Sequence, residues 1–192
     1  MAKVAAIVLA AGLSRRMGSQ NKLFLPIRGK DMIAWTMDAV LSSEANHIML
    51  VASKLSMPKL AGWASERVHL VENQAHETGM TSSIQAGVGA TSADGYIICL
   101  GDQPTVRATT YNQLIQTFKA NPDSIILPYH DGQKGNPVIF PQRHRSAILH
   151  HQEPEGCKSI VQDNMDHVIK VQVEDPGVLI DIDTDADYDQ LR

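Results

Sequence analysis

Short apolar runs recur along the chain and alternate with segments whose apolar residues have helical spacing. The runs cover residues 4–9, 47–52, 68–71, 96–100, 124–128 and 168–173. They have the length of strands, and the first run, VAAIVL, is typical of a strand buried on both faces. Ile33, Met37 and Val40 recur at helical spacing after Asp31, which we expect to cap that helix. This alternation predicts a doubly wound, mostly parallel α/β sheet.

A Gly-rich polar segment in the second half of the chain predicts a change of strand direction. It covers residues 131–137 and lies between the apolar run at 124–128 and a further one at 138–140. Strands joined in this way are typical of a hairpin-like reversal, so we expect a mixed sheet. Helices are also predicted over residues 58–63, 109–119, 142–151 and 156–164. Because no repeat or linker divides the chain, we expect one domain over residues 1–192.

The first apolar run ends in a segment whose composition is typical of phosphate binding. Small residues come first, and polar and cationic residues follow: Ala10, Ala11, Gly12, Ser14, Arg15, Arg16, Gly18 and Lys22. Backbone N–H groups beside small residues can approach an anion closely. No acidic residue lies between positions 3 and 31 to neutralise the cations. We expect a phosphate-binding loop at the carboxyl edge of the sheet; the alternative is an ordinary turn with solvated arginines.

The spacing of the glycines in this loop differs from the two common phosphate signatures. Gly12 and Gly18 are separated by five residues, none of them glycine. A Walker A loop needs G-x-x-x-x-G-K-[ST], and a dinucleotide fingerprint needs G-x-G-x-x-G. A P-loop ATPase and a simple NAD enzyme are therefore disfavoured.

A second segment rich in small and hydroxyl residues begins a predicted helix. Gly79, Thr81, Ser82 and Ser83 precede Ile84, Ala86 and Val88, which have helical spacing. Free backbone donors and hydroxyl groups at a helix start could contact a nucleotide base, sugar or phosphate. The alternative is a capped amphipathic helix with no ligand.

Three aspartates follow apolar segments and are candidate metal ligands. Asp102 comes directly after the run at 96–100, in the tetrapeptide GDQP, where its carboxylate could hold a Mg²⁺ that carries phosphate oxygens. An Asx turn is the alternative. Asp181 and Asp183 are two residues apart on an extended segment, so both should face one side while Ile182 faces the core.

Two carboxylates that converge repel each other unless a cation lies between them. For Asp181 and Asp183 that cation could be Mg²⁺, Lys22 or Arg16. A simpler alternative is that Asp183 or Thr184 caps a final helix, whose N-terminus would be stabilised by the acidic residues that follow.

Composition limits the classes of function. The chain is 43% hydrophobic and 20% charged, which is ordinary for a soluble globular protein. Its net charge of -4 disfavours general nucleic-acid binding. Cys99 and Cys157 have neither zinc-site nor disulfide spacing, and no signal peptide or membrane-spanning run is recognised, so we expect a cytoplasmic protein. The histidines, including His144, His150 and His151, show no metal-binding motif.

Five motifs together resemble those of a known family. LAAGLSRRMGSQNK, GMTSSI, GDQP, GNPV and DIDTDADY occur in the order and spacing of the MobA-like nucleotidyltransferases, and most resemble the members that add a cytidylyl group to the molybdenum cofactor. The resemblance runs from Val4 to about Tyr188. It implies a Rossmann-like three-layer fold with a mixed central sheet and a Mg²⁺-dependent reaction of CTP with molybdenum-molybdopterin, which gives a dinucleotide cofactor and pyrophosphate. It also implies a molybdenum hydroxylase apo-enzyme as the recipient of the product.

The resemblance assigns roles to individual positions. It implies catalytic roles for Arg16, Lys22 and Asp102, and metal contacts for Asp102, Asp181 and Asp183, with either of the last two as the second ligand. It implies that the nucleotide is bound by Leu9, Ala10, Ala11, Gly12, Ser14, Arg15, Arg16, Lys22, Gly79, Thr81, Ser82 and Ser83.

A few positions bear on which nucleotide and which acceptor the protein uses. Members that use GTP tend to have LAGG where this chain has LAAG, and the methyl group of Ala11 leaves less room for a purine. Phe24 and Asn136 depart from the usual family pattern, and both departures concern the acceptor side and leave the triphosphate site untouched. The alternatives are the same transfer with GTP or to a sugar or polyol phosphate, and a cofactor-binding chaperone without turnover.

Overall fold

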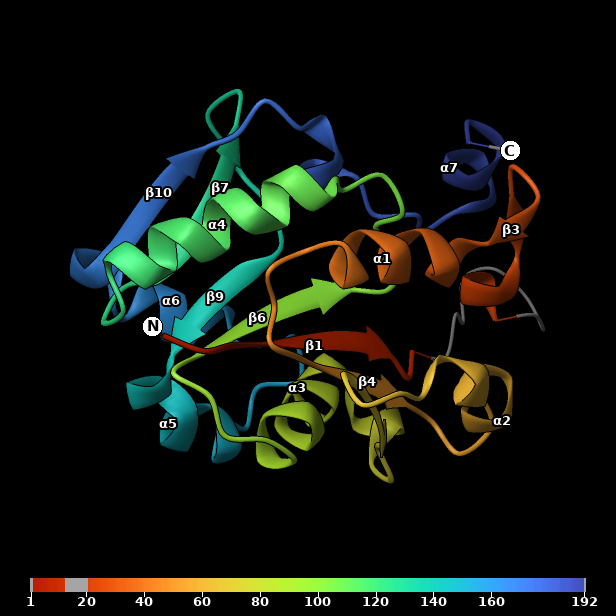
Figure 1. Cartoon of the computed structure of the whole chain (residues 1–192), viewed down its shortest axis with the longest axis horizontal. Helices are drawn as coiled ribbons and strands as arrows, with labels where there is room; N and C mark the ends of the chain where they lie inside the picture. Colours follow the sequence, from red (N-terminus) through yellow and green to blue (C-terminus); the bar gives the residue numbers. More distant parts are fainter. Residues whose placement is uncertain (1, 13–20, 192) are drawn as a thin grey trace.

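The computed structural model describes residues 2–12 and 21–191. These residues form a three-layer structure in which helices cover both faces of a central sheet (Figure 1). The strand order is β10-β7-β9-β6-β1-β4-β5. The strands are β1 (Val4–Ala10), β4 (His47–Ala52), β5 (Val68–Glu72), β6 (Gly95–Leu100), β7 (Ile125–His130), β9 (Val138–Pro141) and β10 (Val168–Gln172). The fold is therefore the three-layer α/β fold that the sequence predicts.

The predicted change of strand direction is confirmed. β1 pairs in parallel with β4 and β6, and β7 with β10, whereas β9 is antiparallel to both β6 and β7. A short strand, β8 (Gln133–Lys134), first forms a hairpin with the end of β7. The chain then returns as β9 between β7 and β6, which makes the sheet mixed.

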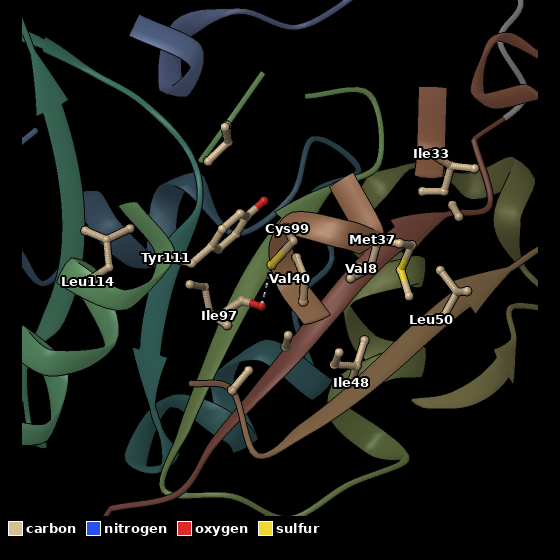
Figure 2. Close-up of a cluster of buried hydrophobic side chains, with 14 of the residues drawn as sticks. Val8, Ile33, Met37, Val40, Ile48, Leu50, Ile97, Cys99, Tyr111 and Leu114 are labelled. Carbon is tan, nitrogen blue, oxygen red and sulfur yellow. Dashed lines mark hydrogen bonds between the residues drawn. The ribbon is translucent and has the colours of Figure 1, made fainter. Parts of the chain in front are cut away.

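Alternate residues of β1 point into two separate cores. Val4, Ala6 and Val8 pack in one cluster with residues of α1 (Met32–Leu41) and α4 (Ala108–Ala120), part of which is drawn in Figure 2. Ala5 and Ile7 pack in the other cluster with α3 (Met80–Gly89), α5 (Arg145–Leu149) and α6 (Lys158–Gln162). Because both faces of β1 are covered, every position of this strand favours an apolar residue.

Smaller elements surround the carboxyl edge of the sheet. They are β2 (Pro26–Ile27), β3 (Lys30–Asp31), α2 (Met57–Leu60) and α7 (Asp185–Asp189). Asp31 directly precedes α1, as predicted, but its side chain makes no capping hydrogen bond. The predicted side-chain cap is therefore wrong. Asp31 is instead the last residue of β3 and pairs with Pro26 of β2, so this strand pair leads the chain into the helix. In the described part of the chain no helix is long and apolar enough to cross a membrane.

Candidate active site

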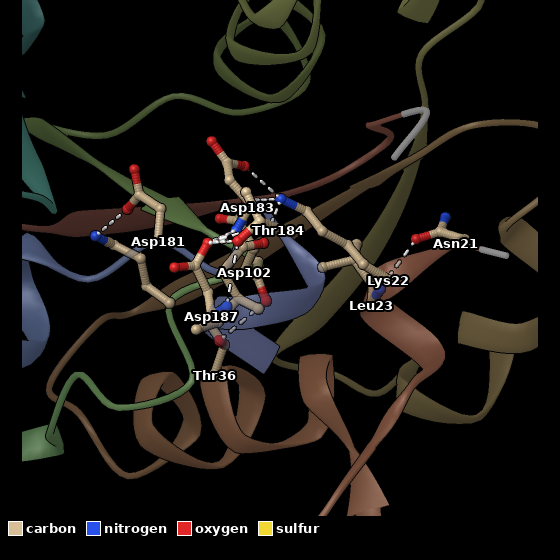
Figure 3. Close-up of polar contacts among 12 residues, drawn as sticks. Asn21, Lys22, Leu23, Thr36, Asp102, Asp181, Asp183, Thr184 and Asp187 are labelled. Atoms are coloured by element: carbon tan, nitrogen blue, oxygen red, sulfur yellow. Dashed lines mark hydrogen bonds and ion pairs between the residues drawn. The ribbon is translucent and has the colours of Figure 1, made fainter. Parts of the chain in front are cut away.

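The carboxyl ends of β1 and β6 bring two of the predicted segments together. The two strands are parallel neighbours, and Leu9 of β1 is in register with Leu100 of β6. Asp102 therefore follows β6 at the same edge where Gly12 follows β1. The backbone N–H of Ile182 donates to the carbonyl of Asp102 at 3.1 Å, which holds the C-terminal segment against this edge. Residues that are far apart in the sequence thus meet at one site (Figure 3).

Lys22 lies at the centre of this site. Its Nζ contacts Oδ2 of Asp102 at 2.6 Å and Oδ1 of Asp183 at 2.8 Å, and it donates to the carbonyl of Ile182 at 2.7 Å. The side chain is only 13% exposed. Burial lowers the pKa of Lys22, but the carboxylates of Asp102 and Asp183 outweigh that effect and leave the pKa above its ordinary value. Lys22 is therefore a protonated cation whose ammonium contacts oxygens of Asp102, Ile182 and Asp183.

Asp181 and Asp183 have different partners. Ile182 between them is buried in the core, as predicted. Asp183 binds Lys22, one of the cations that the sequence suggests, whereas Asp181 accepts a hydrogen bond from Gln103 at 2.7 Å. Partial desolvation and the nearby charges of Asp102 and Asp183 raise the pKa of Asp181. The other suggested cation, Arg16, lies outside the described residues.

The final helix has its own cap. Thr184 accepts from the backbone N–H of Asp187, and the Asp187 carboxylate accepts from the backbone N–H of Thr184, so a capping box begins α7. The hydrogen bonds that the hydroxyl and the backbone N–H of Thr184 donate to the carboxylate of Asp187 lower its pKa. The capping alternative is thus confirmed for Thr184, while Asp183 remains available to Lys22.

The hydroxyl groups at the start of α3 contact two neighbouring loops. The hydroxyl of Thr81 donates to the carbonyl of Glu153 and accepts from the N–H of Gly156. The hydroxyls of Ser82 and Ser83 both accept from Asn73 at 2.9 Å. In this conformation the hydroxyl groups stabilise loops, and a nucleotide contact for them stays a prediction.

Gly79, just before α3, has a conformation that favours glycine. Its φ is 121°, in the left-handed region. A Cβ at this position would lie 2.5 Å from the carbonyl oxygen of Pro154, so the loop around residue 154 can approach the start of α3 closely only because residue 79 is glycine. A role for Gly79 in nucleotide binding stays a prediction.

At the end of β1, main-chain groups rather than side chains are accessible to a ligand. Ala10 and Ala11 are 0% and 1% exposed, and Leu9 is partly buried. Gly12 is exposed, and no atom of residues 2–12 and 21–191 lies within 4 Å of a Cβ built on it. Contacts from this segment to a ligand would therefore come mainly from main-chain groups. The remaining predicted loop residues, Ser14 and Arg15 and also Gly18, lie outside the described residues.

A pocket of about 310 Å³ adjoins Asp181. Its floor is apolar and is formed by side chains of α3, β6 and β9, among them Ile84, Ile98 and Phe140. Its polar lining residues are Lys134, Asn136, Glu155, Lys158 and Asp181. Cys157 also lines it, and burial raises the pKa of its thiol to about 12, so this cysteine is no nucleophile at neutral pH. Apolar walls with a few polar groups are typical of a site for a small organic molecule.

Comparison with known proteins identifies the family. The model of the MobA-like NTP transferase domain matches residues 6–168. The chain belongs to this family. It is 29% identical to the purine catabolism protein PucB of Bacillus subtilis over 97% of this chain and 94% of that protein. It is 23% identical to the molybdenum cofactor cytidylyltransferase of Escherichia coli, over 98% and 95%.

A solved structure supports the fold. A nucleotidyl transferase from Methanothermobacter thermautotroptrophicus superimposes with a TM-score of 0.83 at 21% identity, over 99% of this chain and 96% of that one. The family's chemistry is nucleotidyl transfer. The resemblance that the sequence motifs indicate is thus confirmed for the family, whereas the particular substrates remain to be assigned.

Proposed function

We propose that this protein is a Mg²⁺-dependent cytidylyltransferase that transfers CMP from CTP to the terminal phosphate of molybdenum-molybdopterin and releases pyrophosphate. The observation that carries the proposal is the contact of Lys22 with Asp102 and Asp183 at the edge where the loop after β1 begins. A phosphate-binding loop, a lysine and metal-binding carboxylates are the groups that nucleotidyl transfer needs in one place. The similarity to the E. coli cytidylyltransferase supports the choice of acceptor.

The carboxylates at this site fit a magnesium ion. Carboxylate oxygens are hard ligands, and Asp102 and Asp183 already share a cation, the ammonium of Lys22. Within residues 2–12 and 21–191 no group of three or more acidic, histidine or cysteine side chains could hold a metal by itself. That agrees with the usual habit of Mg²⁺, which binds one or two carboxylates and completes its shell with substrate phosphates and water. Bound there, Mg²⁺ would neutralise charge on the reacting phosphates.

The chain's own residues then have distinct tasks. An acceptor phosphate oxygen attacks the α-phosphorus of CTP, the bond from this phosphorus to the bridging oxygen breaks, and pyrophosphate leaves with that oxygen. The attacking phosphate is already ionised, so no general base is needed. Lys22 would move from the carboxylates to the triphosphate and stabilise the leaving group, together with Arg16. Asp102 would hold the metal, and Asp181 or Asp183 would be its second contact.

The pocket beside Asp181 is proposed to hold the acceptor. An apolar floor suits the flat face of a ring system, and the polar lining suits its edges. Lys134 and Lys158 are exposed and have no ion-pair partner among the residues that the structure describes. These two lysines would offer positive charge to an anionic acceptor, beside the carboxylates of Glu155 and Asp181 that also line the pocket.

Reversal of one of these charges is expected to weaken acceptor binding. Lys158→Glu should raise the KM for the acceptor by about tenfold, roughly the effect of a lost charged contact, while the KM for CTP stays unchanged. Cys157→Phe should do the same by filling the pocket. Steady-state kinetics would measure both, with thermal unfolding as a control for Cys157→Phe because overpacking can destabilise the protein. Equal acceptor KM values for wild type and both variants would show that the acceptor binds elsewhere.

Pyrophosphate release tests the proposed function directly. The protein is incubated with Mg²⁺ and CTP, GTP, ATP or UTP, each with and without molybdenum-loaded molybdopterin. Release that requires both CTP and the acceptor would establish the reaction. Release with GTP would keep the mechanism and contradict the argument from Ala11. No release with any nucleotide, in folded protein, would favour a cofactor-binding chaperone.

Other phosphate-bearing acceptors also need to be tested. The relative at 29% identity is named for purine catabolism and not for a substrate. The assay should therefore also include sugar and polyol phosphates as acceptors. Transfer of CMP to one of these, without transfer to molybdopterin, would replace the acceptor and leave the roles of Lys22 and Asp102 unchanged.

A further inference from the structure

Gln103 is a buried amide that lies between two segments of the site. It follows Asp102 in the chain and is 1% exposed. Its Nε2 donates to Oδ1 of Asp181 at 2.7 Å and to the carbonyl of Val178 at 3.3 Å. Gln103 thus connects the segment after β6 to the C-terminal segment that carries Asp181.

The other end of this amide is unsatisfied. Oε1 of Gln103 is buried and has no hydrogen-bond partner among the described residues. Flipping the amide would not help, because Oε1 would then face two acceptors, the carboxylate of Asp181 and the carbonyl of Val178. An unpaired buried carbonyl costs stability, and such a group calls for an explanation.

The hydrogen bond to Asp181, rather than the one to Val178, explains why the protein tolerates the unpaired carbonyl of Gln103. The carbonyl of Val178 already accepts from the backbone N–H of Asn136 at 2.9 Å, which is shorter than its contact with Gln103. Asp181, by contrast, has Gln103 as its only hydrogen-bond donor in residues 2–12 and 21–191. The hydrogen bond to a carboxylate is also the stronger type.

We propose that Gln103 is a positioning residue that fixes the carboxylate of Asp181 at the junction of the metal site and the acceptor pocket. The proposal rests on the proposed function, because it requires Asp181 to contact the metal or its bound phosphates. A carboxylate that is held by a neutral donor keeps one oxygen available to a cation. Partners that orient a metal-binding carboxylate in this way commonly contribute strongly to metal affinity.

A double-mutant cycle with Mn²⁺ as the probe tests this. Gln103→Met has nearly the same shape but cannot donate, and Asp181→Asn removes the carboxylate charge. Mn²⁺ affinity is measured by electron paramagnetic resonance with saturating α,β-methylene-CTP, and thermal unfolding is measured in parallel. We expect Gln103→Met to weaken Mn²⁺ binding by about 10- to 100-fold. Its Tm should be unchanged or higher, because the unpaired carbonyl is gone.

The cycle separates a positioning role from a structural one. If Gln103 acts through Asp181, the double variant should bind Mn²⁺ no more weakly than Asp181→Asn alone. Gln85→Met is the matched control, because in the described part of the chain the Gln85 amide donates to main-chain carbonyls alone, those of residues 148, 149 and 151. That variant should lose stability and keep the wild-type Mn²⁺ affinity. Gln103→Leu is a second variant in case Gln103→Met does not fold.

Three results would overturn the proposal. The first is wild-type Mn²⁺ affinity in Gln103→Met. The second is a loss of Mn²⁺ affinity on adding Gln103→Met to Asp181→Asn that is as large as its loss in the wild type. The third is wild-type Mn²⁺ affinity in Asp181→Asn itself. The proposed function is judged separately, by pyrophosphate release from CTP in the wild-type protein. A protein that releases pyrophosphate normally while Gln103→Met keeps its Mn²⁺ affinity would refute the role of Gln103 alone.

Discussion

Lys22→Ala is expected to lower turnover by at least about a hundredfold, the typical effect of losing one preorganised electrostatic contact to the transition state. Lys22 is the described cation nearest to the site carboxylates, at 2.6 Å from Asp102 and 2.8 Å from Asp183. Its ammonium lies between these two carboxylates, where a metal ion would also bind. The same variant should therefore bind Mn²⁺ more tightly than the wild type when no nucleotide is present. Pyrophosphate release and Mn²⁺ titration measure the two opposite changes.

A surface lysine provides the control for this variant. Lys119 forms an ion pair with Glu44 at 2.7 Å, away from the site, and Lys119→Ala should keep wild-type turnover. Near-normal turnover of Lys22→Ala would remove Lys22 from the chemistry. Reduced turnover without a gain in Mn²⁺ affinity would show that lysine and metal do not compete for the carboxylates.

The raised pKa of Lys22 has a consequence for stability. The folded pKa lies above the unfolded value of 10.5, so the ion pairs contribute their full stability below about pH 10.5 and lose it as the pH rises through the folded pKa. The difference in unfolding free energy between wild type and Lys22→Ala should thus be constant from pH 7 to about pH 10 and shrink above that. Urea unfolding at several pH values would measure it.

The main features of the fold follow from local patterns in the sequence. The uninterrupted apolar run at 4–9 predicts β1, because a strand with helices on both faces has no position for a polar residue. The reversal at β9 also has a local signal, the polar Gly-rich segment before it. The start of α1 after Asp31 also follows from the sequence, but the missing side-chain cap does not, because Asp31 belongs to a two-residue strand that exists only through its pairing with Pro26.

The candidate site could be predicted only in part. Converging charges have a sequence signal, because two aspartates two residues apart on an extended segment repel each other unless a cation lies between them, and Lys22 is one of the candidate cations. The partner of Asp181 has no such signal. A glutamine can donate in any direction, and the contact of Gln103 with Asp181 spans 78 residues of sequence. The hydroxyl groups of Thr81 and Ser83 are similar, because only the packed loops show that they are already hydrogen-bonded.

Asp102→Asn is expected to lower turnover by at least about a hundredfold, even though it changes the size of the side chain very little. Asp102 is the carboxylate closest to Lys22, and its backbone carbonyl also holds the C-terminal segment through Ile182. The substitution leaves this backbone contact in place and removes the charge, so a loss of turnover would report on the carboxylate and not on the local fold. Asp102→Ala should have an effect at least as large.

A control and a double variant make the test of Asp102 specific. Asp94→Asn is the matched control, because Asp94 directly precedes β6, at the opposite edge of the sheet, and accepts from the backbone N–H of Lys3. It should keep wild-type turnover. Asp102 and Lys22 form an ion pair in the structure. If they act together, the double variant Lys22→Ala/Asp102→Asn should lose little more turnover than the worse of the two single variants. If the two losses multiply instead, each residue acts on a separate step, and the ion pair between them is incidental to the reaction.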